Sequence, residues 1–349
     1  EYKRRIPRFM SEFGFQSFPI LASVKNYAAP EDWHLESSVM RTHQKHPRGN
    51  SLIAKYMESE YLPAKDFESF LYLSQVQQAL GLKIAFEAHR SAMPFCMGTL
   101  YWQFNDCWPV ASWSGIDYYG RWKALHYQAK RSFSPVAVFV EQIDGELDIR
   151  LVSDLRENTA CRIELKVCTF AGETVWHQQS DIVINPNSSE SFVRLNCQTI
   201  QKGHAANALV FVARLISADS ESAISQLPML HEDFYYFVPA KKLALTKPDI
   251  NLTCEHDGQE WVISLLADRL TRQVHLSFSA NNDTDESGVV NFSDNFFDLL
   301  PNESKSVRIR MQGEAGQEQA SFLPKLQVMS LVDSYDLEEN KNNNEFTTY

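Results

Sequence analysis

The chain lacks the features that would tie it to a membrane or to a nucleic acid. A membrane-spanning helix needs about 20 consecutive apolar residues, and no such run occurs among the 349 residues. The net charge is −11, and the longest basic runs are the short Lys3-Arg4-Arg5 and Lys241-Lys242. Phosphate-backbone binding needs clustered Lys and Arg. We therefore expect neither a membrane nor a nucleic acid as partner.

The sequence also lacks the motifs of most cofactor and metal sites. It has no Gly-rich phosphate loop, no G-x-S-x-G elbow and no CxxC pair. His43 and His46 stand three residues apart without a matching carboxylate, which favours a solvated loop over a metal site. Residues 283–294 resemble a calcium loop, but strand-like flanks favour a hairpin turn. We expect no metal, no cofactor and six buried free thiols, at Cys96, Cys107, Cys161, Cys168, Cys197 and Cys254.

Helical and strand-like stretches alternate in the first third of the chain. Residues 8–15 and 97–104 have the apolar character of short buried strands, and residues 31–46 that of a long loop or short helix. Helical patterns cover 66–90, with Asp66 as the N-cap, and 120–132. Apolar strands alternating with helices predict parallel strands buried on both faces, in two strand–helix units.

The pattern changes to a period of two residues near Ser134-Pro135. Apolar and polar residues alternate along several short segments up to residue 215, and again from residue 250 to 311. Such segments separated by turn residues predict β-sandwiches. Leu243 to Pro248 is the expected linker. We expect three domains, namely a strand–helix part at 1–133 and two Ig-like sandwiches at 134–243 and 244–349.

Two segments carry the chemistry of a sugar site. Arg8-Phe9-Met10-Ser11-Glu12-Phe13-Gly14-Phe15-Gln16-Ser17 places one carboxylate in an apolar run, and Tyr101-Trp102-Gln103-Phe104-Asn105-Asp106 joins aromatic faces to amides and a carboxylate. Sugar rings present apolar C–H faces and hydroxyl edges, and glycosidic cleavage uses carboxylates as nucleophile and as acid/base. Together the two segments favour the interpretation that these residues form a glycosidase site, over the interpretation that they are ordinary surface and core residues.

These segments resemble the β-mannosidases of glycoside hydrolase family 2. Further matching positions are Trp113, Gly120-Arg121-Trp122-Lys123, His126-Tyr127, Glu31-Asp32-Trp33, Leu71 to Val76 and Asp294 to Pro301. The resemblance implies that 1–133 is the C-terminal part of a (β/α)8 catalytic barrel, containing its last two strand–helix units. It implies that Glu12 is the catalytic nucleophile of a retaining exo-β-mannosidase and that Trp102 stacks on the sugar.

The resemblance leaves other roles open. Asn105 and Asp106 would either hydrogen-bond sugar hydroxyls or orient Trp102, and Gln103 should be structural. The family's acid/base is a Glu in an Asn-Glu pair on an earlier strand, and no such pair precedes Glu12. We therefore expect the chain to be a C-terminal fragment that lacks the acid/base and is inactive alone.

The expected substrate is a β-mannoside oligosaccharide or glycan, and the family favours a periplasmic, secreted or lysosomal location. The alternatives are another family 2 glycosidase, such as a β-galactosidase or an exo-β-glucosaminidase, and a non-catalytic carbohydrate-binding or scaffold module made of the two sandwiches. The sequence does not indicate the oligomeric state.

Overall fold

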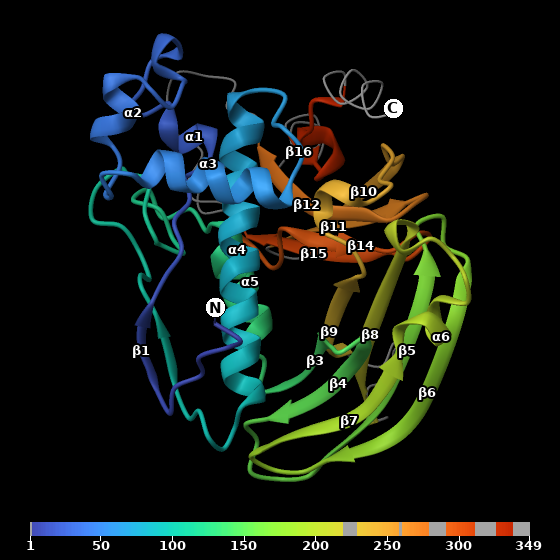
Figure 1. Ribbon diagram of the computed structural model, residues 1–349. Helices are drawn as coiled ribbons and strands as arrows, with labels where there is room; N and C mark the ends of the chain where they lie inside the picture. The colour runs from blue at the N-terminus through green and yellow to red at the C-terminus, as the bar shows by residue number, and fades with distance from the viewer. Residues whose placement is uncertain (1, 219–228, 258–259, 279–290, 311–325, 338–349) are drawn as a thin grey trace, which may run out of the picture. The chain divides into compact units, whose positions relative to one another are not determined.

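The computed structural model describes residues 2–218, 229–257, 260–278, 291–310 and 326–337 (Figure 1). The chain divides into two compact units. Unit 1 comprises Glu1–Phe13, Gly81–Tyr101 and Gln128–Leu245, and unit 2 comprises Gly14–Leu80, Trp102–Tyr127 and Thr246–Tyr349. Each unit therefore combines a part of the first 133 residues with one set of the later strands.

Unit 1 contains a sandwich of two antiparallel sheets (Figure 1). The three-stranded sheet is formed by β3 (Val136–Ile143), β4 (Glu146–Ser153) and β7 (Ser188–Asn196). The four-stranded sheet has the order β6 (Thr174–Ile184), β5 (Thr159–Thr169), β8 (Leu209–Ser217), β9 (Met229–Tyr236). Short helices α6 (Cys197–Gln201), η2 (Ala206–Ala208) and η3 (Ala240–Lys242) complete this part.

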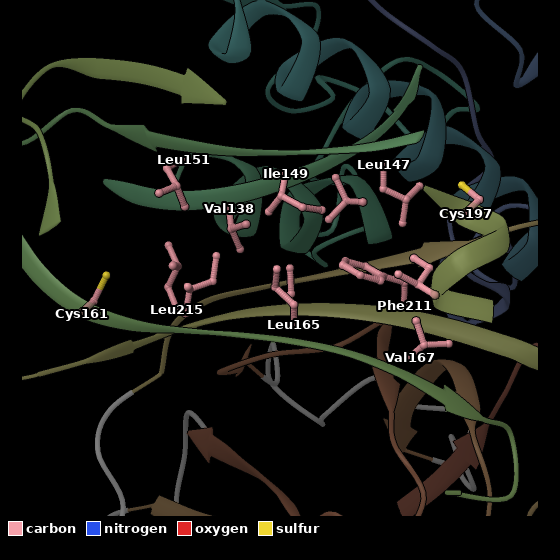
Figure 2. Close-up of a cluster of buried hydrophobic side chains, with 14 of the residues drawn as sticks. Val138, Leu147, Ile149, Leu151, Cys161, Leu165, Val167, Cys197, Phe211 and Leu215 are labelled. Carbon is pink, nitrogen blue, oxygen red and sulfur yellow. The ribbon is translucent and has the colours of Figure 1, made fainter. Parts of the chain in front are cut away.

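The core of this sandwich follows from the alternation of apolar residues along its strands. Figure 2 shows Leu147, Ile149 and Leu151 of β4 pointing toward Leu165 of β5 and Phe211 of β8. All five side chains are at least nine-tenths buried. Side chains two residues apart on a strand share a face, so an alternating sequence presents one continuous apolar face to the opposite sheet. The expected alternation around Leu147, Leu165 and Phe211 is thereby confirmed.

Unit 1 also contains the two short strands of the N-terminal part. β1 (Met10–Phe13) pairs in parallel with β2 (Thr99–Tyr101), with Met10 opposite Thr99 and Phe13 opposite Tyr101. The parallel pairing agrees with the prediction. The predicted extent and burial are wrong, because both strands are shorter than expected and are largely exposed or half-buried. Within the described residues each strand has the other as its one ladder partner, so each strand has one edge without a strand neighbour.

Two helices match the predicted helical segments and contribute residues to both units. They are α4 (Phe67–Ser91) and α5 (Ala124–Ser132). The Asp66 carboxylate accepts a hydrogen bond from the Ser69 backbone N–H at 2.7 Å, which confirms Asp66 as the N-cap of α4. The middle of α4, from Leu71 to Ala79, is buried on every side.

Unit 2 begins with four short helices, of which only the segment 31–46 was considered as a long loop or short helix. They are α1 (Leu21–Val24), η1 (Pro30–Asp32), α2 (Ser38–Thr42) and α3 (Gly49–Glu60). α2 and η1 fit the expected short helix within residues 31–46, whereas α3 was not predicted. α3 buries only Ile53 and Met57 among its larger apolar residues. That stripe is too short to give a clear helical period.

Unit 2 also contains the second sandwich. One sheet has the order β10 (Ile250–Asp257), β11 (Glu260–Ala267), β15 (Lys305–Arg310), β13 (Asn291–Phe292). The other has the order β14 (Phe297–Leu299), β12 (Thr271–Phe278), β16 (Leu326–Met329), followed by η6 (Val332–Ser334). Tyr72 of α4 donates its hydroxyl hydrogen to the Gln273 carbonyl at 2.6 Å. This bond fixes the N-terminal half of α4 on β12.

Three smaller expectations have distinct outcomes. All six cysteines are free thiols, but Cys107 is exposed, so the prediction of six buried thiols is wrong at that position. Most of the calcium-loop-like segment 283–294 lies outside the described residues. No helix in the described part of the chain is both long enough and apolar enough to cross a membrane.

A partly buried ion cluster links α4 to the sandwich of unit 1. The Lys83 ammonium lies 2.7 Å from a Glu87 oxygen and 2.8 Å from an Asp233 oxygen. The other Asp233 oxygen accepts the Val140 backbone N–H at 2.9 Å. Two carboxylates thus share one ammonium in a site largely shielded from water, and burial raises the pKa of Glu87 to about 7. Burial also lowers the pKa of His231, near Asp233, to about 4.

We expect Phe211→Ala to destabilise unit 1 strongly. Phe211 is fully buried, and removing a buried phenyl ring costs about 3–5 kcal/mol through lost burial and the cavity left behind. Val183→Ala on β6 is the matched control, because Val183 is 62% exposed and its loss should change stability by less than about 0.5 kcal/mol. Urea unfolding followed by circular dichroism measures both. Equal effects of the two substitutions would contradict the assigned core.

We expect Glu87→Gln to change how stability depends on pH. The pKa of Glu87 rises from an ordinary 4.5 to about 7 on folding, so its contribution is fully present below pH 4.5 and is lost as the pH rises through 7. The wild-type chain should therefore lose stability relative to Glu87→Gln between pH 5 and pH 8, by on the order of 1–3 kcal/mol. The contribution of His231 is lost in the opposite direction, as the pH falls through about 4, and is common to both proteins.

Urea titrations at several pH values make this comparison. Glu157→Gln is the control, because Glu157 is an exposed residue of a turn in the same unit. A constant difference between the wild-type chain and Glu87→Gln across this range would show that Glu87 does not take up a proton on folding.

Candidate active site

The Glu12 carboxylate lies on β1 and is exposed. The next residue, Phe13, is buried in unit 1 and packs edge-on against Phe86 and His89, at ring-centroid distances of 5.9 and 5.3 Å. Because neighbouring side chains on a strand point to opposite faces, burial of Phe13 turns Glu12 away from this cluster. Arg8 lies over the Phe95 ring instead of pairing with Glu12. Within the described residues the Glu12 carboxylate makes no hydrogen bond or ion pair and is available for chemistry.

In unit 2, Gly14 passes directly against the backbone of Trp102. A Cβ atom on Gly14 would lie 2.3 Å from the Trp102 carbonyl oxygen and 2.9 Å from Trp113 Cδ1. Both distances are shorter than any ordinary van der Waals contact, so no side chain fits at position 14. The glycine therefore allows the segment after β1 to lie against the loop that begins at Trp102.

Trp102 presents about half of its surface to solvent. It is 51% exposed, and the following peptide bond to Gln103 is cis. The Gln103 backbone N–H donates to the Trp113 carbonyl at 3.1 Å, and the Gly115 N–H donates back to the Gln103 carbonyl at 3.0 Å. An exposed indole on an anchored backbone is what a stacking platform for a sugar requires.

Asp106 belongs to this loop, and both oxygens of its carboxylate accept hydrogen bonds from the protein. It is 4% exposed. One oxygen accepts hydrogen bonds from the hydroxyls of Ser112 at 2.8 Å and Ser114 at 2.5 Å. The other accepts from the Gln103 amide and the Lys45 ammonium, both at 3.3 Å. The carboxylate thus gathers donors from both ends of the loop and from a distant segment.

Asn105 differs from its neighbour because it is exposed. Its amide nitrogen makes one long contact, 3.4 Å to the Asp106 carbonyl, and its amide oxygen accepts no hydrogen bond from a described residue. The side chain is therefore free to meet a polar ligand. Gln103, by contrast, donates to the Asn105 carbonyl at 2.6 Å as well as to Asp106, in agreement with a structural role.

Trp108, Trp113 and Trp122 are half-buried. Trp122 packs edge-on against His126, at a ring-centroid distance of 4.3 Å. These indoles are therefore partly covered supports of the loop, whereas Trp102 is the more open one.

Two sets of residues that hold the loop were not predicted from the sequence. The first is the segment 43–46, in which His43 stacks on Tyr27 at 4.1 Å and contacts the Pro109 carbonyl at 2.6 Å through Nδ1. The second is the polar face of α4. Gln78 is fully buried, donates to the carbonyls of Phe15 at 2.7 Å and Ser114 at 3.2 Å, and accepts from the Ser17 hydroxyl at 2.7 Å.

A buried lysine adds a further tie. Lys123 is 2% exposed, and its ammonium donates to the carbonyls of Ser17 at 3.2 Å and Ser112 at 3.5 Å. Burial lowers the pKa of Lys123 to about 8, although Asp106 and Asp117 act in the opposite direction. Its motif, Gly120-Arg121-Trp122-Lys123, was part of the family resemblance, but nothing in the sequence showed that this lysine is buried.

The structure brings Trp102, Asn105 and Asp106 together in unit 2, and places Glu12 on β1 of unit 1. Within the described residues no three His, Cys, Asp or Glu side chains are grouped as metal ligands. His46 Nδ1 accepts the Arg48 backbone N–H at 3.2 Å. A hollow of about 460 Å³ in unit 2 is lined by other residues, including Lys65, Glu68 and His275, and contains none of the predicted site residues.

Two family models match the later part of the chain. Residues 145–242 match a Mannosidase Ig/CBM-like domain, and residues 245–334 match an Ig-fold domain. These matches confirm the prediction of two Ig-like domains. The larger part of the chain is therefore β-structure of the Ig type.

Curated relatives cover most of the chain. The β-mannosidase of Capra hircus is 31% identical over 277 residues, which are 74% of this chain and 31% of that protein. The β-mannosidase A of Emericella nidulans is 26% identical over 361 residues, which are 94% of this chain and 37% of that protein. The chain thus spans about a third of the length of these relatives.

A solved β-mannosidase structure is also similar to most of this chain. The β-D-mannosidase from Dictyoglomus thermophilum has a TM-score of 0.81 and 27% identity, covering 94% of this chain and 38% of that one. An exo-chitosanase from Amycolatopsis orientalis has a TM-score of 0.68 at 14% identity, covering 93% of this chain and 42% of that one. The second likeness shows a shared fold only.

Proposed function

Because the chain belongs to the β-mannosidases of glycoside hydrolase family 2, we propose that the full-length protein is a retaining exo-β-mannosidase. It would remove terminal non-reducing β-D-mannose residues from oligosaccharides or glycans. The observation that carries the proposal is the likeness to a β-D-mannosidase structure across 94% of the chain at a TM-score of 0.81.

We propose that residues 1–133 are the C-terminal part of a (β/α)8 barrel and contain its last two strand–helix units, followed by sandwich domains at 134–243 and 244–349. The parallel pairing of β1 with β2 supports the barrel, because barrel strands are all parallel. Phe9, Met97 and Leu100, in or beside these strands, are each more than half exposed. Further barrel strands would cover such apolar surface and complete the ladder. The boundaries of the two matched Ig-type domains, at 242 and 245, support the second division.

We propose that Glu12 is the nucleophile. Its ionised carboxylate would attack the anomeric carbon while an acid protonates the departing glycosidic oxygen, and water would then hydrolyse the glycosyl–enzyme ester. Retaining enzymes hold the two carboxyl groups about 5–5.5 Å apart. The resemblance assigns the acid/base to an Asn-Glu pair ahead of Glu12, which this chain does not contain. The chain alone should therefore not turn over substrate.

We propose that Trp102, Asn105 and Asp106 form the sugar-binding side of the site. The half-exposed indole of Trp102 offers a flat apolar face to the C–H groups of a sugar. The open amide oxygen of Asn105 suits a sugar hydroxyl. Asp106 would act on the sugar indirectly, by holding the loop in shape, since its oxygens already accept hydrogen bonds from the protein.

Another family 2 specificity, such as a β-galactosidase or an exo-β-glucosaminidase, is the alternative within this class. A non-catalytic carbohydrate-binding or scaffold role of the sandwiches is the alternative outside it. Hydrolysis of p-nitrophenyl β-mannoside, β-galactoside and β-glucosaminide by the full-length protein separates the three. We expect the mannoside to be hydrolysed best; preference for another sugar would identify the first alternative, and binding without hydrolysis the second.

We expect Glu12→Gln to abolish turnover of p-nitrophenyl β-mannoside by the full-length protein and to leave its fold intact. A neutral amide cannot form the covalent glycosyl intermediate, and the acid/base cannot replace that step. Glu173→Gln, in an exposed turn of the first sandwich, is the matched control and should keep the wild-type rate. A near-normal rate in Glu12→Gln would remove Glu12 from the mechanism.

We expect Trp102→Ala to lower kcat/KM, because stacking of the sugar is lost. The corresponding loss of transition-state stabilisation should be roughly 1–3 kcal/mol. Trp102→Phe should fall between the wild type and Trp102→Ala, since it keeps a smaller aromatic face. Steady-state kinetics and thermal melts are measured together. Unchanged kinetics with a lower melting temperature would mean that Trp102 is a packing residue.

A further inference from the structure

The segment 43–46 pairs with the far side of the loop that carries Trp102. We propose that Lys45 is a positioning residue, and that its ammonium acts through Asp106 and Gln103 to hold Trp102 in place for the sugar. The inference deepens the proposed function and rests on it for the role of Trp102. All the residues concerned belong to unit 2.

Backbone hydrogen bonds fix the starting point of the Lys45 side chain. The Lys45 N–H donates to the Ala111 carbonyl at 3.2 Å, and the Ala111 N–H donates to the His43 carbonyl at 2.9 Å. His46 adds an edge-on ring contact to Trp113 at 6.3 Å. Because the backbone is held at His43 and Lys45 and the His46 ring packs on Trp113, the long Lys45 side chain starts from a fixed point and loses less freedom when it orders.

The ammonium contacts two acceptors that belong to the loop. It lies 3.3 Å from an Asp106 oxygen and 3.4 Å from the Gln103 amide oxygen. The Lys45 side chain is 21% exposed and that of Asp106 is 1% exposed, so water screens this pair only weakly. Gln103 in turn donates to Asp106, and it directly follows Trp102 in the chain. The ammonium therefore closes a small network at the base of Trp102.

Loss of the ammonium would leave unmet acceptors inside this network. The Gln103 amide oxygen would lose its donor, and one Asp106 oxygen would keep only the Gln103 amide. A buried acceptor left without its donor is unfavourable, so we expect the loop to sample other arrangements. Lys123, whose ammonium also interacts electrostatically with Asp106, keeps the carboxylate partly compensated. The effect should therefore fall on the position of the loop and leave the fold in place.

A displaced indole affects binding of the sugar more than the carboxylate chemistry. Lys45→Met in the full-length protein should raise KM for p-nitrophenyl β-mannoside by about tenfold, equivalent to about 1.4 kcal/mol, with kcat changed by less than about twofold. Hydrogen exchange of backbone amides in residues 102–113 should become faster. Lys45→Arg should keep both KM and the exchange rates close to those of the wild type, because a guanidinium donates to the same two acceptors.

Lys55→Met is the matched control, since Lys55 is an exposed lysine on α3 of the same unit. It should leave KM and the exchange of residues 102–113 unchanged. Lys45→Gln is a second neutral variant, in case the methionine packs badly. If both neutral variants lose the global circular dichroism signal, Lys45 is a general structural residue and the positioning role is overturned.

The two readouts separate failure of this inference from failure of the proposed function. If the wild-type protein does not hydrolyse mannosides, the proposed function fails, and the exchange of residues 102–113 still tests whether Lys45 holds the loop. A raised KM without faster exchange would mean that Lys45 touches the sugar itself. That result, or no change in either readout, would overturn the positioning role.

Discussion

The buried amide of Gln78 is the contact on which the frame of the site depends. It lies on the part of α4 that is covered on every side, where a polar group without partners would be costly. Its nitrogen donates to the carbonyls of Phe15 and Ser114, and its oxygen accepts from Ser17. One side chain thus joins the segment after Gly14 to the loop after Trp102. The helix thereby helps to set the distance between these two irregular segments, which also exchange backbone hydrogen bonds between Ser17 and Ser112.

Neighbouring residues of α4 repeat this arrangement. The Ser74 hydroxyl accepts the Phe18 backbone N–H at 3.1 Å, and the Gln75 amide oxygen accepts the Ala124 N–H at 3.2 Å. Ser74, Gln75 and Gln78 therefore form a polar row within a buried helix, and each binds backbone outside it. Buried polar groups of this kind add less to stability than apolar packing does, but they specify one arrangement of the chain. A loop proposed to bind a sugar needs that specificity.

Local patterns predicted a large part of the fold. The alternation along β4, β5 and β8 and the cap at Asp66 depend on residues close together in the sequence, and both agree with the structure. The prediction that β1 and β2 are buried was wrong, because the burial of a strand depends on which distant parts of the chain pack against it and not on its own apolar character. Helix α3 was missed for a related reason. Its short buried stripe is determined by what packs on it.

The site shows the same division between local and distant signals. Glu12 and Trp102 stand in dense local motifs and were therefore found as candidates. Lys45 was not, because it reaches Asp106 across 61 residues of sequence and its own surroundings read as a solvated loop. Nor does the sequence show that the two Asp106 oxygens are filled by Ser112, Ser114, Gln103 and Lys45. That knowledge comes only from the folded chain.

The carboxylate clusters around Lys83 and around Asp106 differ in how many donors each oxygen receives. In unit 1, burial raises the pKa of Glu87, and the neighbouring Asp233 carboxylate, which shares the Lys83 ammonium, adds to the rise. In unit 2, a single carboxylate, Asp106, receives two hydroxyls, one amide and one ammonium. Its oxygens are engaged by protein donors, whereas the amide of Asn105 is exposed. Under the proposed function, Asp106 would therefore fix the shape of this loop, and Asn105 and Trp102 would face the sugar.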